Sequence, residues 1–364
     1  MTKSTHQFLL VEPIAKTPYP PLGLMKISSM LKHQYPNCSI FSQVGNGIPS
    51  GLCYPEAIYI TSLFTWHIDK VIKSVHFYRR QYPRAEIKVG GIAASLLPDY
   101  IRERTGIDPH RGVLADAENF SPDYSQTFGR KLKSSITYAS RGCIRQCKFC
   151  NVNALEPEFT VNDNWERDVC KIFSSITFWD NNWLASPNFV KDVEKLRKLN
   201  KKVDFNQGLD ARLYNSEKAR ILSLIDLDPI RFAFDNLSDE KAVINAISVA
   251  KKFSKKEIRV YVLYNFNDTP EDFYYRIDLL NKLNVLVFPM QFRNSMEIHQ
   301  KSPGPHWNTY FLRAMNLSLL FYYRKGMITE KRESFLKIYG GNSTEFKDKL
   351  YKIYEYDKAI IRYH

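Results

Sequence analysis

Short β-forming runs alternate with amphipathic segments along most of the chain, and this alternation restricts the fold more than any other feature of the sequence. Four such runs lie in the first part of the chain, at 7–13, 39–44, 57–63 and 86–90. The segments between them carry apolar residues at helical spacing, as at 22–33 and 67–82. Strands that alternate with helices predict a parallel sheet covered by helices on both faces. We therefore expect a doubly wound, Rossmann-like α/β domain over residues 1–130.

A second series of strands and helices begins at Ser134, after a loose connection over 105–133. Asp108, Pro109 and the turn-rich segment 118–129 indicate that connection. Helical segments such as 189–200 and 271–283 separate six further β-forming runs, at 135–140, 176–179, 203–207, 230–234, 259–264 and 285–292. Six β-α units predict an open, partial (β/α)6 barrel over residues 131–296.

The last part of the chain, residues 297–364, is expected to be a helical extension, because the β pattern stops after Met296. Apolar residues at helical spacing cover 307–326, 330–340 and 344–356. From 293 to 364, thirteen Lys and Arg stand against seven Asp and Glu, with Tyr and Phe interspersed. This composition could form a basic, aromatic surface for an extended substrate. We favour the alternative of an amphipathic helical cap whose aromatic residues are buried and whose charges are solvated.

Composition restricts the class of protein and of partner. A hydrophobic content of 44% with 25% charged residues is typical of a globular chain with a sizeable core. The formal net charge of +14 would attract polyanions, so a nucleic acid base or a nucleotide is a candidate substrate. The first residues lack the apolar region of a signal peptide, and no stretch reaches the roughly 18 apolar residues of a membrane span. We expect a cytoplasmic protein.

Three of the six cysteines lie within eight positions, directly after the run at 135–140, in the order Cys143, Cys147, Cys150. Three thiolates on one short loop can bind three irons of a cuboidal cluster. No fourth cysteine is in sequence reach, so the fourth iron should stay open to another ligand. A structural zinc site completed by a distant histidine is the alternative. The other cysteines stand alone and are expected to be small buried residues, namely Cys38, Cys53 and Cys170.

The spacing CxxxCxΦC, with Phe149 as the aromatic residue, resembles the motif of the radical S-adenosylmethionine (SAM) superfamily. The resemblance implies a 4Fe-4S cluster on the three cysteines, with the open iron chelated by the amino and carboxylate groups of SAM. It also implies reductive cleavage of SAM to methionine and a 5′-deoxyadenosyl radical, which abstracts hydrogen from the substrate. The electron would come from a reductant protein of the flavodoxin or ferredoxin type.

Polar residues after the later β-forming runs are candidate SAM contacts, because barrel enzymes place their sites at the carboxyl ends of strands. Asp180 stands where the family has an acidic segment that contacts the SAM amino group; it could instead cap the following helix. Asn206 and Gln207 begin a polar segment that ends at Arg212, which could bind the SAM carboxylate. Equally, Arg212 could pair with Asp210 and only shape the loop.

Three further strand ends complete the candidate set. Asp235, with Asn236 beside it, occupies the place where relatives carry Glu-Ser, so the resemblance implies a contact to the ribose. Gln291 ends the sixth run, close to Arg293, and could face the substrate or the adenosine. The segment 264–273 matches the family only in its turn, so we expect Thr269 or Asp268 to be a helix N-cap before a proline at the first helical position.

The first domain resembles the cobalamin-binding-type domain that precedes the radical core in one subgroup of the superfamily. This resemblance rests on 11–32 and 88–95. The chain has no DxHxxG string, and DPHRG at 108–112 is interpreted as a turn. Cobalamin is therefore the less favoured cofactor, and a degenerate scaffold is the alternative role of this domain.

Three other functions stay open beside a radical SAM enzyme of unidentified substrate. The first is a cobalamin-dependent radical SAM methyltransferase. The second is an iron-sulfur binding or electron-transfer protein without SAM turnover. The third is an RNA-binding module with a structural metal, for which zinc and salt-sensitive RNA affinity are expected.

Overall fold

The computed structural model describes residues 6–298, 303–321 and 326–362. The chain forms two compact units, of which the first comprises Met1–Ile176 with Asn294–His299 and the second Thr177–Arg293 with Gln300–His364. Residues 1–5 lie outside the described residues, as do 299–302, 322–325 and 363–364 of the expected C-terminal extension. No helix in the described part of the chain is long and apolar enough to cross a membrane.

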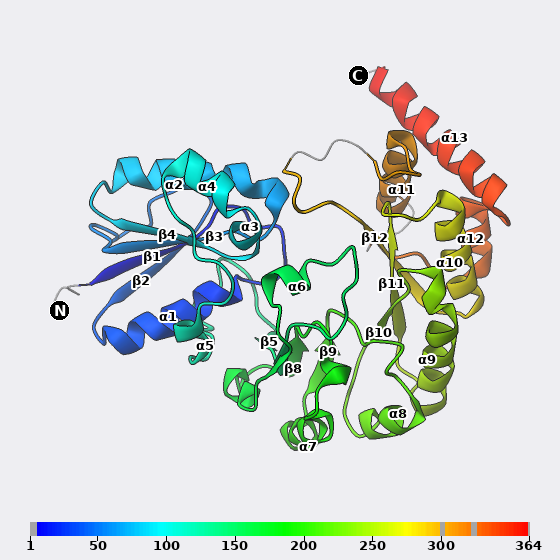
Figure 1. Cartoon of the computed structure of the whole chain (residues 1–364), viewed down its shortest axis with the longest axis horizontal. Helices are drawn as coiled ribbons and strands as arrows, with labels where there is room; N and C mark the ends of the chain where they lie inside the picture. The colour runs from blue at the N-terminus through cyan, green and yellow to red at the C-terminus, as the bar shows by residue number, and fades with distance from the viewer. Residues whose placement is uncertain (1–5, 299–302, 322–325, 363–364) are drawn as a thin grey trace. The chain divides into compact units, whose positions relative to one another are not determined.

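The first unit contains a four-stranded parallel sheet. Its strands are β1 (Gln7–Glu12), β2 (Ser39–Val44), β3 (Ala57–Thr61) and β4 (Glu86–Gly90), in the order β2-β1-β3-β4. The helices of this region are α1 (Leu22–Gln34), α2 (Ile68–Gln81), α3 (Ile92–Leu96), α4 (Pro98–Thr105) and α5 (Ala115–Glu118), with the 3-10 turn η1 (Thr65–His67). In Figure 1, α1 and α5 cover one face of this sheet, and α2, α3 and α4 cover the other.

Alternation along β1 explains why both faces are covered. Phe8 and Leu10 belong to the apolar cluster that includes residues of α1, whereas Leu9 and Val11 belong to the cluster that includes residues of α2. Each of these side chains is almost fully buried, and burial of one such side chain stabilises a fold by about 1.5–3 kcal/mol. Successive side chains of a strand point to opposite faces, so a run of apolar residues requires a helix layer on each side.

The rest of the first unit carries the cysteine motif between two short paired strands. The elements are β5 (Ser134–Thr137), β6 (Ser140–Arg141), α6 (Val152–Leu155), β7 (Thr160–Val161) and the 3-10 turn η2 (Trp165–Asp168). Strands β6 and β7 pair in antiparallel fashion, with Ser140 opposite Val161 and Arg141 opposite Thr160. The chain therefore leaves the sheet region at Arg141, passes through the cysteines, and returns at Thr160.

The second unit continues the alternation of strands and helices. Its strands and helices are β8 (Ser175–Phe178), whose first residues belong to the first unit, η3 (Trp183–Ala185), α7 (Phe189–Leu199), β9 (Lys202–Phe205), α8 (Ser216–Leu222), β10 (Ile230–Ala233), η4 (Leu237–Asp239), α9 (Glu240–Phe253), β11 (Ile258–Tyr264), α10 (Pro270–Lys282) and β12 (Leu286–Gln291). Strands β10, β11 and β12 form a parallel sheet in that order. The other three-stranded sheet has the order β5-β8-β9.

The six strands expected for a partial barrel thus fall into two three-stranded sheets. Between them the chain makes a parallel bridge from Val203 to Leu227. A hydrogen bond from the Leu209 N–H to the Arg231 carbonyl joins the turn after β9 to β10. The molecule is a mixed α/β protein with parallel sheets.

The C-terminal part of the second unit is helical. It comprises α11 (Thr309–Phe321), α12 (Arg332–Tyr339) and α13 (Ser343–Arg362). Phe335, Tyr339 and Phe346 are fully buried, whereas Tyr351 and Tyr356 are exposed. Three aromatic residues of these helices are therefore core residues, as is typical of amphipathic helices that pack with one face inward.

Candidate functional site

The cysteine loop, residues 142–151, connects β6 to α6 and contains no regular secondary structure. Cys143 and Cys147 are half-buried and Cys150 is exposed. The Cys143 sulfur accepts the Arg145 N–H at 3.3 Å, and the Cys147 carbonyl accepts the Cys150 N–H at 3.0 Å. One backbone donor, the Arg145 N–H, thus points to a cysteine sulfur at the start of the loop. Phe149 is half-buried between two of the cysteines.

The entry to the loop requires a glycine. Gly142 has φ +74°, and a Cβ atom there would lie 2.2 Å from the Glu158 carbonyl oxygen. Side chains are disfavoured at such φ values, and the close approach removes the remaining space. The loop therefore leaves β6 packed directly against the segment by which the chain returns to β7.

Side-chain amides hold the far part of the loop. Asn153 donates from Nδ2 to the Arg145 carbonyl at 2.9 Å, and Asn151 donates to the Ser295 hydroxyl. These bonds tie α6 and the segment after β12 to the cysteines. Each such bond stabilises the folded conformation of the loop by about 1 kcal/mol.

The three cysteines fit an iron-sulfur cluster in their chemistry, because thiolates are the usual ligands of its irons and all three lie on one short loop. Within residues 6–298, 303–321 and 326–362, no group of three or more His, Cys, Asp or Glu side chains is already arranged to hold a metal ion. The fit therefore lies in the identity and spacing of the three cysteines.

The isolated cysteines differ from the expectation. Cys38 and Cys170 are half-buried and Cys53 is exposed, so the expectation that all three are buried is wrong. Burial still raises the pKa of the Cys38 thiol above its ordinary value. Cys53 is exposed because it lies in the loop before β3, where its N–H donates to the Gln7 side chain at 2.8 Å.

Asp180 lies directly after β8 and is 2% exposed. The 3-10 turn η3 has Asn182 at its N-cap position, and α7 has Asn188. The alternative that Asp180 caps the following helix is therefore wrong.

Arg212 pairs with Asp210. Its Nε lies 2.7 Å from Asp210 Oδ1, and its backbone N–H donates to the same oxygen at 3.1 Å. Asn182 donates to Asp210 Oδ2 at 3.1 Å. The loop-shaping arrangement expected as an alternative is thus present. The Arg212 side chain is 37% exposed, and its Nη1 lies 3.7 Å from Asp239 Oδ1.

Asn206 and Gln207 form the turn after β9. The Asn206 N–H donates to the Phe178 carbonyl at 3.0 Å, and its carbonyl accepts the Tyr261 hydroxyl at 2.8 Å. Gln207 is exposed. The backbone of Asn206 is therefore fixed by β8 and β11, while Gln207 stands in solvent.

Asp235 follows β10 and is half-buried, and its Oδ1 accepts the Leu263 N–H at 3.0 Å. Burial raises the pKa of Asp235 to about 6. The hydrogen bond from the Leu263 N–H and the charge of Arg276 favour the ionised form, but burial outweighs them. A carboxyl group with a pKa in this range can hold or release a proton near neutral pH.

The sequence analysis missed Arg276. This side chain is 1% exposed and donates to the carbonyl oxygens of Phe234 and Asp235 at 2.9 and 3.0 Å, and to Asp268 Oδ2 at 2.7 Å. It fixes the backbone at the end of β10. Its position on the buried face of α10, three residues after Phe273, is the sequence signal that could have identified it.

Gln291 is the last residue of β12 and is half-buried; its Oε1 accepts the Asn316 amide at 3.4 Å. Thr269 is the N-cap of α10, with Pro270 at the first helical position, as expected. The structure thus joins Arg212 to Asp210 and Asn182, and Asp235 to Arg276. Phe149 and the three cysteines belong to the first unit, and the other candidate residues belong to the second.

Comparisons with known proteins point to one fold. No family model and no curated protein matches the sequence. The apo, selenomethionine-labelled cobalamin-dependent S-adenosylmethionine radical enzyme OxsB is similar with a TM-score of 0.51 and 14% identity, over 76% of this chain and 51% of that one. This chain therefore spans about half the length of the OxsB structure.

Two structures of Streptococcus suis SuiB are also similar. SuiB bound to its precursor peptide SuiA gives a TM-score of 0.40 with 15% identity, over 56% of this chain and 51% of that one. SuiB bound to S-adenosylmethionine gives 0.39 with 12% identity, over 70% of this chain and 60% of that one. The likeness to OxsB shows that this chain shares a fold with about half of that structure.

Proposed function

We propose that the chain is a radical SAM enzyme in which Cys143, Cys147 and Cys150 hold a 4Fe-4S cluster. The observation that carries the proposal is the CxxxCxΦC loop between β6 and β7 in a chain with the fold of OxsB. With three protein thiolates, the cluster would keep one iron for SAM and supply the electron that cleaves it. The likeness in fold supports the class of enzyme and leaves the substrate open.

The strand-end residues would bind SAM and exclude water. Asp180 is the proposed contact to the SAM amino group, because it is a buried acid at the end of β8. Arg212 would bind the SAM carboxylate, with Asp210 holding the guanidinium in place. Asp235 would contact the ribose, and its raised pKa lets it donate as well as accept a hydrogen bond.

Phe149 would pack beside the cluster, and Asn206, Gln207 and Gln291 would face the adenosine or the substrate. A nucleic acid base or nucleotide is the proposed substrate class, supported by the net charge of +14. A flavodoxin- or ferredoxin-type protein is the proposed electron donor, and the cytoplasm the proposed location. The proposed domains are a cobalamin-binding-like domain at 1–130, a partial (β/α)6 barrel at 131–296 and the helical extension at 297–364.

A cobalamin-dependent methyltransferase is the second candidate. The likeness to OxsB, a cobalamin-dependent enzyme, and the parallel sheet β2-β1-β3-β4 favour it. The chain lacks the DxHxxG string whose histidine binds cobalt. Cobalt content and methyl transfer to a substrate would distinguish this candidate from the first.

The proposal is tested by anaerobic reconstitution with iron and sulfide, followed by dithionite and SAM. The expected product is 5′-deoxyadenosine, formed by the wild-type chain and by Cys53→Ala, the matched control at an exposed cysteine outside the motif. Cys147→Ala should form none. An intact cluster without 5′-deoxyadenosine under any reductant would favour the electron-transfer alternative, and bound zinc with salt-sensitive RNA affinity would favour the RNA-binding one.

A further inference from the structure

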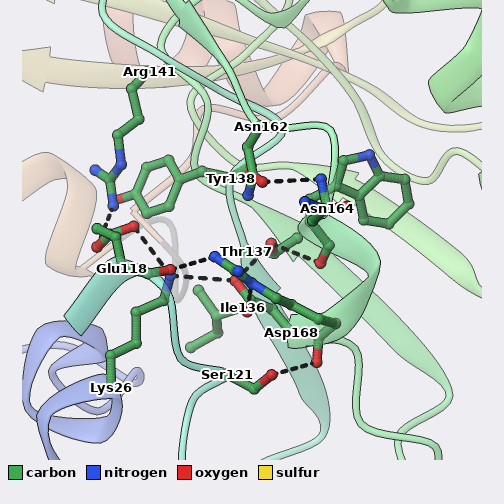
Figure 2. Close-up of polar contacts among 12 residues, drawn as sticks. Lys26, Glu118, Ser121, Ile136, Thr137, Tyr138, Arg141, Asn162, Asn164 and Asp168 are labelled. Atoms are coloured by element: carbon green, nitrogen blue, oxygen red, sulfur yellow. Dashed lines mark hydrogen bonds and ion pairs between the residues drawn. The ribbon is translucent and has the colours of Figure 1, made fainter. Parts of the chain in front are cut away.

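A chain of alternating charges runs through the first unit from helix α1 to the base of the cysteine loop. Lys26 of α1 is 1% exposed, and its Nζ lies 3.1 Å from Glu118 Oε2 at the end of α5. The other oxygen of Glu118 lies 3.0 Å from the Arg141 guanidinium. Figure 2 shows Glu118 between these two cations, which come from segments more than a hundred residues apart in the sequence.

Arg141 connects Glu118 to the cysteine loop. Its Nη1 lies 2.8 Å from Glu156 Oε1, and the second oxygen of Glu156 accepts the Gly142 N–H at 2.8 Å. Glu156 stands just after α6, at the end of the cysteine-bearing segment. The Glu156 carboxylate thus links the end of the cysteine-bearing segment to Arg141 and Gly142, where the chain enters that segment. The guanidinium also stacks on the Tyr138 ring, 4.0 Å from its centroid.

Glu118 is ionised in this arrangement. Burial alone would raise its pKa, but the charges of Arg141 and Lys26 outweigh burial and hold the pKa below its ordinary value. A carboxylate shared by two partly or fully buried cations cannot be replaced by a neutral group without leaving both cations undercompensated. The connection through Glu118 therefore depends on its charge as well as its shape.

Asp168 anchors the opposite end of the chain of charges. It is 1% exposed, its Oδ2 lies 3.4 Å from Lys26 Nζ, and the same oxygen accepts the Thr137 hydroxyl of β5 at 3.1 Å. Lys26 is thereby fixed between two carboxylates, and the position of Glu118 follows from that of α1. Buried charges held on several sides are rigid, because a shift of one leaves another unpaired.

We propose that Glu118 and Glu156 are positioning residues of the cysteine loop. Both bind Arg141, and through it they connect the loop that carries the three cysteines to helices α1 and α5. The proposal rests on the proposed function only in assigning a cluster to the loop. It gives the N-terminal α/β region a task that needs no cobalamin: its Lys26–Glu118 pair holds the loop in place from outside the cysteine segment.

The first test uses the full chain without metal. Glu118→Gln and Glu156→Gln keep the shape of each side chain and remove its charge, and Glu103→Gln is the control, in an exposed pair with Arg104 on α4. Trypsin cleavage after Lys148, an exposed residue of the loop, is followed by mass spectrometry. We expect cleavage about tenfold faster in both glutamine variants, because proteolysis of a folded chain follows the population of the locally open state.

Circular dichroism and urea unfolding show whether each variant is folded. A folded Glu118→Gln chain cleaved at the rate of Glu103→Gln would overturn the proposal. Should Glu118→Gln fail to fold, Glu156→Gln decides, because the Glu156 carboxylate binds Arg141 and the Gly142 N–H at the start of the loop. Glu118→Asp, which restores the charge with a shorter reach, should recover part of the protection.

The second test measures iron per chain after anaerobic reconstitution and the electron paramagnetic resonance signal of the reduced protein. Glu118→Gln and Glu156→Gln should retain about half or less of the wild-type iron with an altered signal, because disturbed outer contacts weaken metal sites. Glu103→Gln should match the wild type. If the wild-type chain binds no iron, the proposed function fails, while the protease comparison still decides the positioning role. Full iron retention together with wild-type protection from trypsin in both glutamine variants would overturn the positioning role.

Discussion

Gly142 lies so close to Glu158 that a Cβ atom on the glycine would be 2.2 Å from the glutamate carbonyl oxygen. The two residues stand at the entry and the exit of the cysteine segment, next to the paired strands β6 and β7. This close approach means that the segment is closed at its base by backbone packing as well as by the Arg141–Glu156 pair.

Gly142→Ala should therefore destabilise the chain more than its backbone angle alone requires. Gly129 is the matched control: its φ of +75° nearly equals the +74° of Gly142, but a Cβ there meets nothing within 4 Å. We expect Gly129→Ala to lower the free energy of unfolding by about 1 kcal/mol and Gly142→Ala by about 3 kcal/mol. Urea unfolding of the chain without metal measures both. Equal losses would show that the loop can move away from Glu158 without cost.

The capping box at the start of α10 gives a second prediction. The Thr269 hydroxyl accepts the Asp272 N–H at 3.1 Å, and the Asp272 carboxylate accepts the Thr269 N–H at 3.0 Å. Thr269→Ala removes the first bond and should lower the free energy of unfolding by about 1 kcal/mol, as caps generally do. Thr269→Ser keeps the hydroxyl and should lose less than half of that. An alanine variant as stable as the serine variant would contradict the role of the cap.

The fold was largely predictable because its strands and helices follow local patterns. The runs predicted at 39–44 and 86–90 match β2 and β4, and the segment predicted at 189–200 matches α7 to within one residue. Alternating burial and helical periodicity are local properties, so a single sequence reports them. Thr269 was predictable for the same reason, since a cap and its proline are neighbours in the chain.

The site was predictable only where its residues are close in sequence. The spacing of Cys143, Cys147 and Cys150 indicates their chemistry without any knowledge of the fold. Arg276 and Lys26 were missed, because each is a cation whose carboxylate or carbonyl partners come from other elements. Asp180 was proposed from its place after a strand, but its burial, and the N-cap position of Asn182 before the next 3-10 turn, required the structure. Long-range pairing cannot be read from one sequence.

Arg276 gives a third prediction, about the end of β10. Its guanidinium spreads over the carbonyls of Phe234 and Asp235 and the carboxylate of Asp268, a geometry that the single ammonium group of a lysine cannot reproduce. Arg276→Lys should lower the free energy of unfolding by about 3 kcal/mol, because it leaves buried acceptors without donors.

The control for Arg276→Lys is Arg197→Lys, in an exposed pair with Glu194 on α7. Surface pairs of this kind contribute at most about 1 kcal/mol, so Arg197→Lys should be nearly neutral. Urea unfolding compares the two variants. Similar effects of both substitutions would mean that the carbonyls at the end of β10 do not depend on the guanidinium.

Asp235 gives the last prediction, which concerns pH. Burial raises its pKa to about 6 in the folded chain, from an ordinary value of 3.8. Between these values the folded chain keeps a proton that the unfolded chain has released, so the free energy of unfolding falls as the pH rises through this window. Asp235→Asn keeps the oxygen that accepts the Leu263 N–H but cannot ionise.

The stability of Asp235→Asn relative to the wild type should therefore increase by about 2 kcal/mol between pH 4 and pH 7, since one unit of pKa corresponds to about 1.4 kcal/mol and the side chain is only half-buried. Urea unfolding of both chains at several pH values measures this difference. The nearby charges of Arg276, Arg212 and Asp239 are the same in both chains, so they do not account for a change with pH in the difference. A difference that stays constant from pH 4 to pH 7 would mean that Asp235 ionises in the folded chain as it does in the unfolded one, and the carboxyl would then lose its proposed ability to donate a hydrogen bond to the ribose.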